Sequence, residues 1–146
     1  RKTIKDIKDV MHTDFESMVL TDFNKTRAFV KIQDGCNNFC SFCIIPYARG
    51  NVRSKKREDV LNEIDTLVKE GHKEIVLTGI HTGHYGEDNK NYKFADLIAD
   101  ILKIEGLKRL QISSIEITEL DDKFLKLLNL CVFMFSLLFS IFVFTS

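Results

Sequence analysis

The sequence contains no tryptophan, one proline and only four cysteines in 146 residues. Four cysteines are too few for a small domain held together by disulfides, and three of them fall within eight residues. Its 21 basic residues equal its 21 acidic residues, which argues against a uniformly basic nucleic-acid coat and against an acidic disordered tail. A hydrophobic share of 45% excludes intrinsic disorder. We therefore expect one modest folded domain.

Charge is distributed unevenly along the chain. Residues 129–146 carry no charge and hold five of the 12 phenylalanines. Residues 1–25 are mixed in character with weak periodicity, so we expect them to be a linker or the end of a missing N-terminal domain. Residues 26–128 would form the folded core, and 129–146 an aberrant apolar tail. That tail is long enough to span a bilayer. However, its residue types favour a frameshift or truncated gene over a membrane anchor or a buried segment.

The regular part of the sequence alternates strands with helices. Apolar runs predict strands at 28–32, 74–78 and 107–112. Apolar side chains at helical spacing predict helices at 55–70, with Ser54 as N-cap and Gly71 as stop, at 94–102, and from Thr118 to Leu128. This order predicts an α/β fold with a parallel sheet and right-handed crossovers. Chemistry is then expected in the loops after the carboxyl ends of the strands.

The first of these loops carries the three clustered cysteines, Cys36, Cys40 and Cys43. Thiolates are soft ligands, so three on one loop favour a metal centre. Three protein ligands would leave one iron of a 4Fe–4S cluster open. A structural zinc would need a fourth ligand, from Cys131, His81 or His84. We favour iron–sulfur over zinc and over unrelated buried thiols.

Other polar residues near this loop support weaker hypotheses. Cations at Arg49, Arg53, Lys55, Lys56 and Arg57 suggest a patch for RNA phosphates, although a solvated helix start would look similar. A direct catalytic role for His81 and His84 is the less favoured interpretation, since exposed loop histidines are common. The aromatic rings of Phe39 and Phe42, which lie between the cysteines, are expected to shield the cluster.

Two segments resemble a known family. Residues 26–55, TRAFVKIQDGCNNFCSFCIIPYARGNVRSK, closely resemble the cluster segment of radical S-adenosylmethionine enzymes. Within these they are similar to the methylthiotransferases, where G-C-x3-C-x2-C precedes a proline and an Arg-Gly pair, here Pro46, Arg49 and Gly50. Residues 77–86, LTGIHTGHYG, resemble the subfamily acting on threonylcarbamoyladenosine in tRNA. The isopentenyladenosine subfamily tends to show L-G-Q-N-V-N there, and the ribosomal-protein subfamily Gln-Asp-Thr.

The resemblance implies a fold, a site and a reaction. The fold would be the first three strand–helix units of a partial, truncated parallel β/α (TIM-like) radical SAM barrel. Its three cysteines would bind the 4Fe–4S cluster, whose open iron holds S-adenosylmethionine. Electron transfer would release a deoxyadenosyl radical, which abstracts hydrogen from C2 of the modified adenine before a methylthio group is installed. Residues expected to contact cofactor or substrate are Thr78, Gly79, Ser113 and Glu116.

The resemblance also implies partners. These are tRNA and an electron donor of flavodoxin or ferredoxin type. A second cluster is expected as a cofactor in the missing N-terminal domain. A cytoplasmic location without a membrane is expected, and this fragment would not be active alone. The alternatives are a methylthiotransferase for isopentenyladenosine tRNA or a ribosomal protein, a non-catalytic zinc-knuckle RNA-binding module, and a gene remnant.

Overall fold

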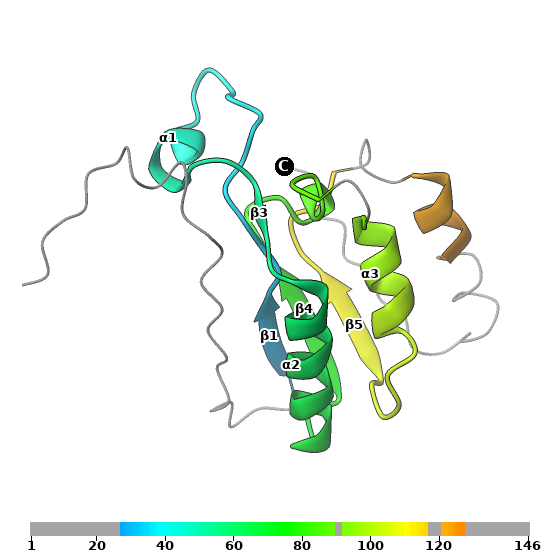
Figure 1. Ribbon diagram of the computed structural model, residues 1–146. Helices are drawn as coiled ribbons and strands as arrows, with labels where there is room; N and C mark the ends of the chain where they lie inside the picture. Colours follow the sequence, from blue (N-terminus) through cyan, green and yellow to red (C-terminus); the bar gives the residue numbers. More distant parts are fainter. Residues whose placement is uncertain (1–26, 90–91, 117–120, 128–146) are drawn as a thin grey trace, which may run out of the picture.

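A parallel sheet organises the computed structural model, which describes residues 27–89, 92–116 and 121–127. Its strands are β1 (Arg27–Lys31), β4 (Glu74–Thr78) and β5 (Arg109–Ile112), in the order β1-β4-β5. Helices α2 (Arg57–Lys69) and α3 (Phe94–Ile101) follow β1 and β4 along the chain and lie on the same face of the sheet (Figure 1). Sequential parallel neighbours joined by right-handed crossovers place every helix on one face. The predicted α/β fold with a parallel sheet is confirmed.

The core lies between this sheet and the two helices. Side chains at alternate strand positions form two rows across the sheet, and all are at most 6% exposed: Ala28, Ile75 and Leu110, then Val30, Leu77 and Ile112. They join one hydrophobic cluster with the apolar faces of α2 and α3. Each large apolar side chain buried in this way contributes about 1.5–3 kcal/mol.

The start of α2 differs from the prediction. The helix begins at Arg57, and Ser54 is not its N-cap but belongs to β3 (Arg53–Ser54). Strand β3 pairs antiparallel with β2 (Gln33–Asp34). The Ser54 hydroxyl accepts a hydrogen bond from the Gly86 amide at 2.8 Å. These long-range bonds hold the segment extended, so the helix starts later than its apolar periodicity suggests. Gly71, with φ of +105°, ends the helix as predicted.

Two short helical elements, like the two-residue strands β2 and β3, have no counterpart among the predictions. Helix α1 (Ile45–Arg49) contains Pro46 in its first turn and is followed by Gly50, and η2 (Thr82–His84) is a single 3-10 turn. Both are too short to produce a periodic pattern.

The last described helix spans residues 122–127. The Asp121 carboxylate accepts a hydrogen bond from the Phe124 amide at 2.7 Å, so Asp121 is the N-cap. The expected cap at Thr118 lies outside the described residues, as do Cys131 and the segments 1–25 and 129–146. Across the described ranges, no helix combines the length and apolar character that crossing a bilayer requires.

Candidate functional site

The carboxyl ends of β1, β4 and β5 bring three loops to one edge of the sheet. We call them the cysteine loop (35–52), the β4 loop (79–86) and the β5 loop (113–116). The cysteine loop and α1 rise from this edge in Figure 1. The Thr82 hydroxyl donates to the Ser113 carbonyl at 2.6 Å, and the Thr82 amide donates to the Ser114 carbonyl at 3.0 Å. These bonds join the β4 loop to the β5 loop.

The cysteine loop is closed at its neck by hydrogen bonds. The Cys36 amide donates to the Gly50 carbonyl at 3.1 Å, and the Val52 amide donates to the Asn37 side chain at 3.1 Å. The two sides of the neck approach so closely that a Cβ on Gly35 would lie 1.9 Å from the carbonyl oxygen of Asn51. The backbone at position 35 also has a φ of +75°, so both the close approach and the left-handed conformation require glycine there.

Asp34 anchors this neck electrostatically. Its carboxylate lies 2.8 Å from the Lys31 ammonium, 3.4 Å from the Arg53 guanidinium and 3.8 Å from the Arg49 guanidinium. Burial alone would raise the pKa of Asp34, but hydrogen bonds from Lys31 and the Gly35 amide, with the charges of Lys31 and Arg49, lower it below its usual value. Asp34 therefore stays ionised and draws three cations toward the base of the loop.

The three cysteines are free thiols with graded exposure: Cys36 is buried, Cys43 half-buried and Cys40 exposed. The Cys43 amide donates to the Cys40 carbonyl at 3.0 Å, and the Asn38 amide lies 3.5 Å from the Cys36 sulfur. Three soft donors on one loop suit iron–sulfur ligation in kind and in number. Within the ranges that the structure describes, no three His, Cys, Asp or Glu side chains converge tightly enough to hold a metal ion. We call residues 38–43 the tip of this loop, and it carries Cys40 and Cys43.

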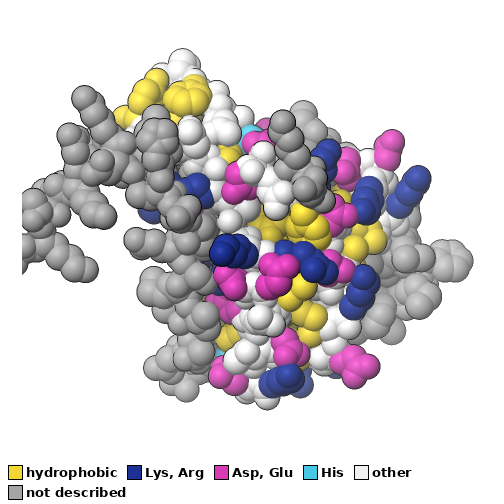
Figure 2. Space-filling model, in the orientation of Figure 1, with side chains coloured by type: hydrophobic (Ala, Val, Ile, Leu, Met, Phe, Trp, Pro, Cys, Tyr) yellow, Lys and Arg dark blue, Asp and Glu magenta, His cyan; other side chains and the backbone are white. Residues whose placement is uncertain are grey.

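Large apolar side chains surround the tip of the cysteine loop. Phe42 is 93% exposed, and Phe39, Ile44 and Tyr47 are also exposed. Figure 2 shows this concentration of hydrophobic side chains over the loop and α1. The rings of Phe39 and Tyr47 meet edge to face at 5.7 Å. That Phe39 and Phe42 shield a cluster stays a prediction.

The four residues expected to contact cofactor or substrate all lie at this edge: Thr78, Gly79, Ser113 and Glu116. The hydroxyl of Thr78 points toward the Val30 carbonyl at 3.4 Å, and that of Ser113 donates to the Leu77 carbonyl at 3.0 Å. Both hydroxyls are thus engaged by the sheet's own backbone. The Glu116 carboxylate is mostly exposed and lies 3.2 Å from His81 Nε2.

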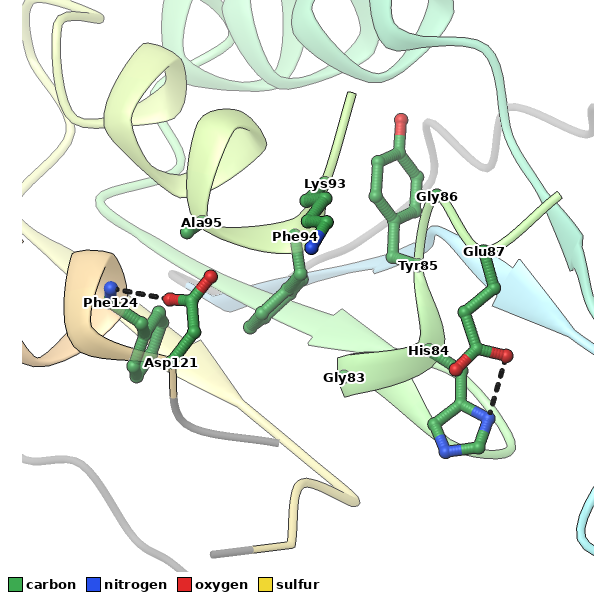
Figure 3. Close-up of a pocket in the computed structure, with 10 residues that line it drawn as sticks. All are labelled: Gly83, His84, Tyr85, Gly86, Glu87, Lys93, Phe94, Ala95, Asp121 and Phe124. Carbon is green, nitrogen blue, oxygen red and sulfur yellow. Dashed lines mark hydrogen bonds and ion pairs between the residues drawn. The ribbon is translucent and has the colours of Figure 1, made fainter. Parts of the chain in front are cut away.

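The structure corrects the interpretation of His81 and His84 as exposed loop residues. Each side chain is only 13% exposed, and the two rings lie 4.2 Å apart. Figure 3 shows His84 against Glu87, with 3.2 Å between His84 Nδ1 and the carboxylate. The low exposure of the two imidazoles depends on contacts with residues distant in sequence, such as Glu116 beside His81, which sequence spacing alone does not show.

Lys55 is a second correction, because it is not a surface cation. Its side chain is 2% exposed and pairs with the buried carboxylate of Glu63 on α2. The Lys55 amide donates to the Ile32 carbonyl at 2.8 Å, and the Tyr85 hydroxyl donates to the Lys55 carbonyl at 2.8 Å. These backbone bonds turn the residue into the core, so Lys55 is unavailable to RNA phosphates.

The remaining cations of the expected patch fall into two groups. Arg53 forms an ion pair with Asp34. Arg57 forms one with Asp100, whose carboxylate lies 2.8 Å from the Arg57 guanidinium. Arg49, though near Asp34, is exposed, and so is Lys56. Over α2 and α3, basic and acidic side chains alternate rather than separate (Figure 2). Of the cations in the expected patch, Arg49 and Lys56 are therefore the ones best placed to contact phosphates.

A cavity of about 380 Å³ beside the β4 loop has no counterpart among the sequence predictions. It lies between that loop, the start of α3 and the helix 122–127 (Figure 3). Phe94 and Phe124, on its wall, stack with their centroids 5.6 Å apart. Nothing in the local sequence could have indicated it, because its wall combines segments separated along the chain.

Comparison with known proteins identifies the family. The family described as the radical SAM superfamily matches residues 30–140, most of the chain. This chain belongs to the radical SAM superfamily. Membership implies a 4Fe–4S cluster and S-adenosylmethionine as cofactors.

Two curated proteins are similar to this chain over much of its length. The chain is 48% identical over 132 residues to "Threonylcarbamoyladenosine tRNA methylthiotransferase MtaB" of Bacillus subtilis, covering 88% of this chain and 29% of that protein. It is 50% identical over 97 residues to "tRNA-2-methylthio-N(6)-dimethylallyladenosine synthase" of Carboxydothermus hydrogenoformans, covering 66% of this chain and 22% of that protein. The chain thus spans less than a third of the length of these relatives.

Proposed function

We propose that this protein is a radical SAM transferase that adds a methylthio group to C2 of threonylcarbamoyladenosine beside the tRNA anticodon. The observation that carries the proposal is the single edge where the cysteine loop meets the β4 loop. The end of β4 and the β4 loop, residues 77–86, have the sequence LTGIHTGHYG, which resembles the threonylcarbamoyladenosine subfamily, and a relative of that name is 48% identical. We further infer that the three parallel strands are the first of a β/α barrel.

The chain's own residues would hold the cofactors at this edge. Cys36, Cys40 and Cys43 would ligate the cluster, with Cys36 already fixed by the closed neck. The backbone at Thr78 and Gly79 would hold the amino group of the methionine moiety. When bound, the cluster and S-adenosylmethionine supply the one-electron chemistry by which a C–H bond is replaced with a C–S bond. An electron donor of flavodoxin or ferredoxin type and a cytoplasmic location belong to the same proposal.

Anaerobic reconstitution of the 146-residue chain tests the cluster assignment. We expect about four irons per chain with matching sulfide, and an electron paramagnetic resonance spectrum that changes when S-adenosylmethionine is added. Replacing Cys36, Cys40 or Cys43 with Ala should each abolish the brown absorption, whereas Ser41→Ala, an exposed change on the same loop, should not. Full iron in all three cysteine variants, or bound zinc in place of iron, would remove the basis for the enzyme and favour a zinc-knuckle module.

The substrate needs a separate test, because the 50% identical relative is named for dimethylallyladenosine. The gene should be expressed in a host that lacks both 2-methylthio modifications, and its tRNA nucleosides analysed by mass spectrometry. A methylthio mass on threonylcarbamoyladenosine alone supports the proposal. The same mass on dimethylallyladenosine would assign the chain to the other tRNA subfamily.

Arg49 and Lys56 are the proposed phosphate contacts. Lys56→Gln should weaken tRNA binding and make its salt dependence shallower by about one unit, because one fewer counterion is released. Lys69→Gln removes the same charge at the far end of α2 and should leave both quantities unchanged. Equal effects of the two substitutions would show that only net charge matters, and would refute a local patch.

A further inference from the structure

A buried amide side chain lies between the two loops that form the candidate site. Gln33 is fully buried, and every polar atom of its side chain is hydrogen-bonded. Its Nε2 donates to the Gly35 carbonyl at 2.7 Å and to the Asp34 carbonyl at 3.1 Å. Its Oε1 accepts from the His81 amide at 2.9 Å. One side chain thus spans from the residue before Cys36 to the β4 loop.

Gln33 also lies directly against Gly79. A Cβ on Gly79 would be 2.8 Å from Gln33 Oε1 and 3.2 Å from Gln33 Cβ. Real Cβ atoms essentially never approach another atom within 3.0 Å, so the absent side chain of Gly79 provides the space in which the amide lies. The glutamine and the glycine therefore form one packing unit.

This bridge begins where the sheet ladder ends. Just past the end of β1, the Ile32 amide still donates a hydrogen bond to the carbonyl of Thr78, the last residue of β4, at 2.9 Å. Beyond it, the cysteine loop and the β4 loop diverge, and the amide of Gln33 connects them. The flat amide group donates to one loop and accepts from the other. A carboxylate of the same shape loses the donor, and a thioether loses the donor and keeps only a weak acceptor.

We propose that Gln33 is a positioning residue that fixes the distance between the cluster ligand Cys36 and the methionine-binding backbone at Gly79. The inference rests on the proposed function, which places those two groups. Gln33 acts through Gly35 and His81 and touches neither cofactor. Its loss should leave the thiols able to bind a cluster, but should misplace the β4 loop relative to the open iron.

The test separates cluster assembly from cofactor binding. Gln33→Met and Gln33→Glu should retain the iron content of the reconstituted wild-type chain. The S-adenosylmethionine concentration that half-saturates the paramagnetic resonance change should rise about tenfold in each variant, because Met loses the donated and accepted hydrogen bonds of Gln33 and Glu loses the two donated bonds. The same two substitutions at Gln111, on β5, serve as matched controls and should leave that concentration unchanged.

Three outcomes would overturn the inference. Half-saturation within twofold of wild type in both Gln33 variants shows that the bridge does not position the loops. Loss of iron in both, with iron kept in the Gln111 variants, shows that Gln33 holds the cluster loop itself. A wild-type chain whose spectrum ignores S-adenosylmethionine overturns the proposed function first, and the inference with it.

A second measurement needs no cofactor. Hydrogen exchange over residues 77–86 of the cluster-free chain should be faster in Gln33→Met than in Gln111→Met, because the His81 amide has lost its acceptor. Equal exchange in these two variants contradicts the bridge even if cofactor affinity has changed.

Discussion

The buried ion pair between Lys55 and Glu63 gives the most demanding test of the structure. Both side chains are nearly inaccessible, at 2% and 3% exposed. Lys55 precedes α2 and Glu63 lies within it, so the pair joins the end of the cysteine-loop segment to the helix. An exposed basic patch and a buried ion pair predict opposite consequences for the same substitution.

The expected magnitude follows from burial. Lys55→Met leaves the Glu63 carboxylate in an apolar setting without its partner, and breaking a buried pair in this way costs about 3–5 kcal/mol. Replacing both, as Lys55→Met with Glu63→Leu, removes both desolvation penalties and should return the free energy of unfolding to within about 1 kcal/mol of wild type. The Tyr85 hydroxyl bonds the backbone carbonyl of Lys55, so that contact persists in all variants.

Urea unfolding at pH 7, followed by circular dichroism, measures these differences, and equal m-values would show that the variants unfold from comparable states. Lys69→Met is the matched control, because Lys69 pairs with Asp65 on the surface of the same helix and is 74% exposed. It should change stability by less than about 1 kcal/mol. A single Lys55→Met variant that loses less than about 1 kcal/mol, or a double variant as unstable as the single one, would refute the reasoning.

Two further predictions concern acid stability and the loop neck. A hydrogen bond from Lys103, and others from Arg57 and Tyr92, lower the pKa of Asp100 from 3.8 to about 2 despite some desolvation. The stability that the Asp100 carboxylate contributes is therefore complete above about pH 4 and is lost as pH falls toward 2. Asp100→Asn should cost about 1–2 kcal/mol at pH 6 and should flatten the dependence of stability on pH between 4 and 2, as measured by urea midpoints. Parallel pH profiles of wild type and variant would contradict this. Gly35→Ala should prevent closure of the neck and reduce the iron retained after reconstitution by more than half, because its Cβ would lie 1.9 Å from a carbonyl oxygen. Gly71→Ala, also at positive φ but with nothing within 4 Å, should keep full iron with a cost of about 1–2 kcal/mol; equal iron in the two variants would show that the neck does not matter.

Long elements of this fold were predictable because their signal is local. Strand β4 was expected at 74–78 and spans Glu74–Thr78, and α3 was expected from Phe94 and begins there. Continuous apolar runs and helical spacing report burial directly. Strands β2 and β3 have two residues each and exist because they pair across the neck of the cysteine loop. No window of sequence contains that information.

The sequence predicts the cysteine ligands of the candidate site, but not the residues that hold its loops in place or pair with its cations. The spacing of the three cysteines places them on one loop whatever the fold. Whether a cation is free depends on partners that are distant in sequence: Lys55 finds Glu63, and Arg57 finds Asp100, 43 residues away. Gln33 looks in sequence like an ordinary polar residue at a strand end, and its reach to the His81 amide depends on the parallel register of β1 and β4.

The division of the cysteine loop into a fixed neck and an open tip has an energetic consequence for cluster assembly. Ordering backbone costs about 1–2 kcal/mol per residue. If binding had to order the whole loop, residues 35–52, the cost would be roughly 18–36 kcal/mol, more than the roughly 10–16 kcal/mol that a structural metal site supplies. With the neck already closed, ligation has at most the tip, residues 38–43, left to rearrange, which sets an upper limit of roughly 6–12 kcal/mol. Thiol substitutions should therefore abolish the cluster and neck substitutions should reduce its retention, but only neck substitutions should also destabilise the cluster-free chain.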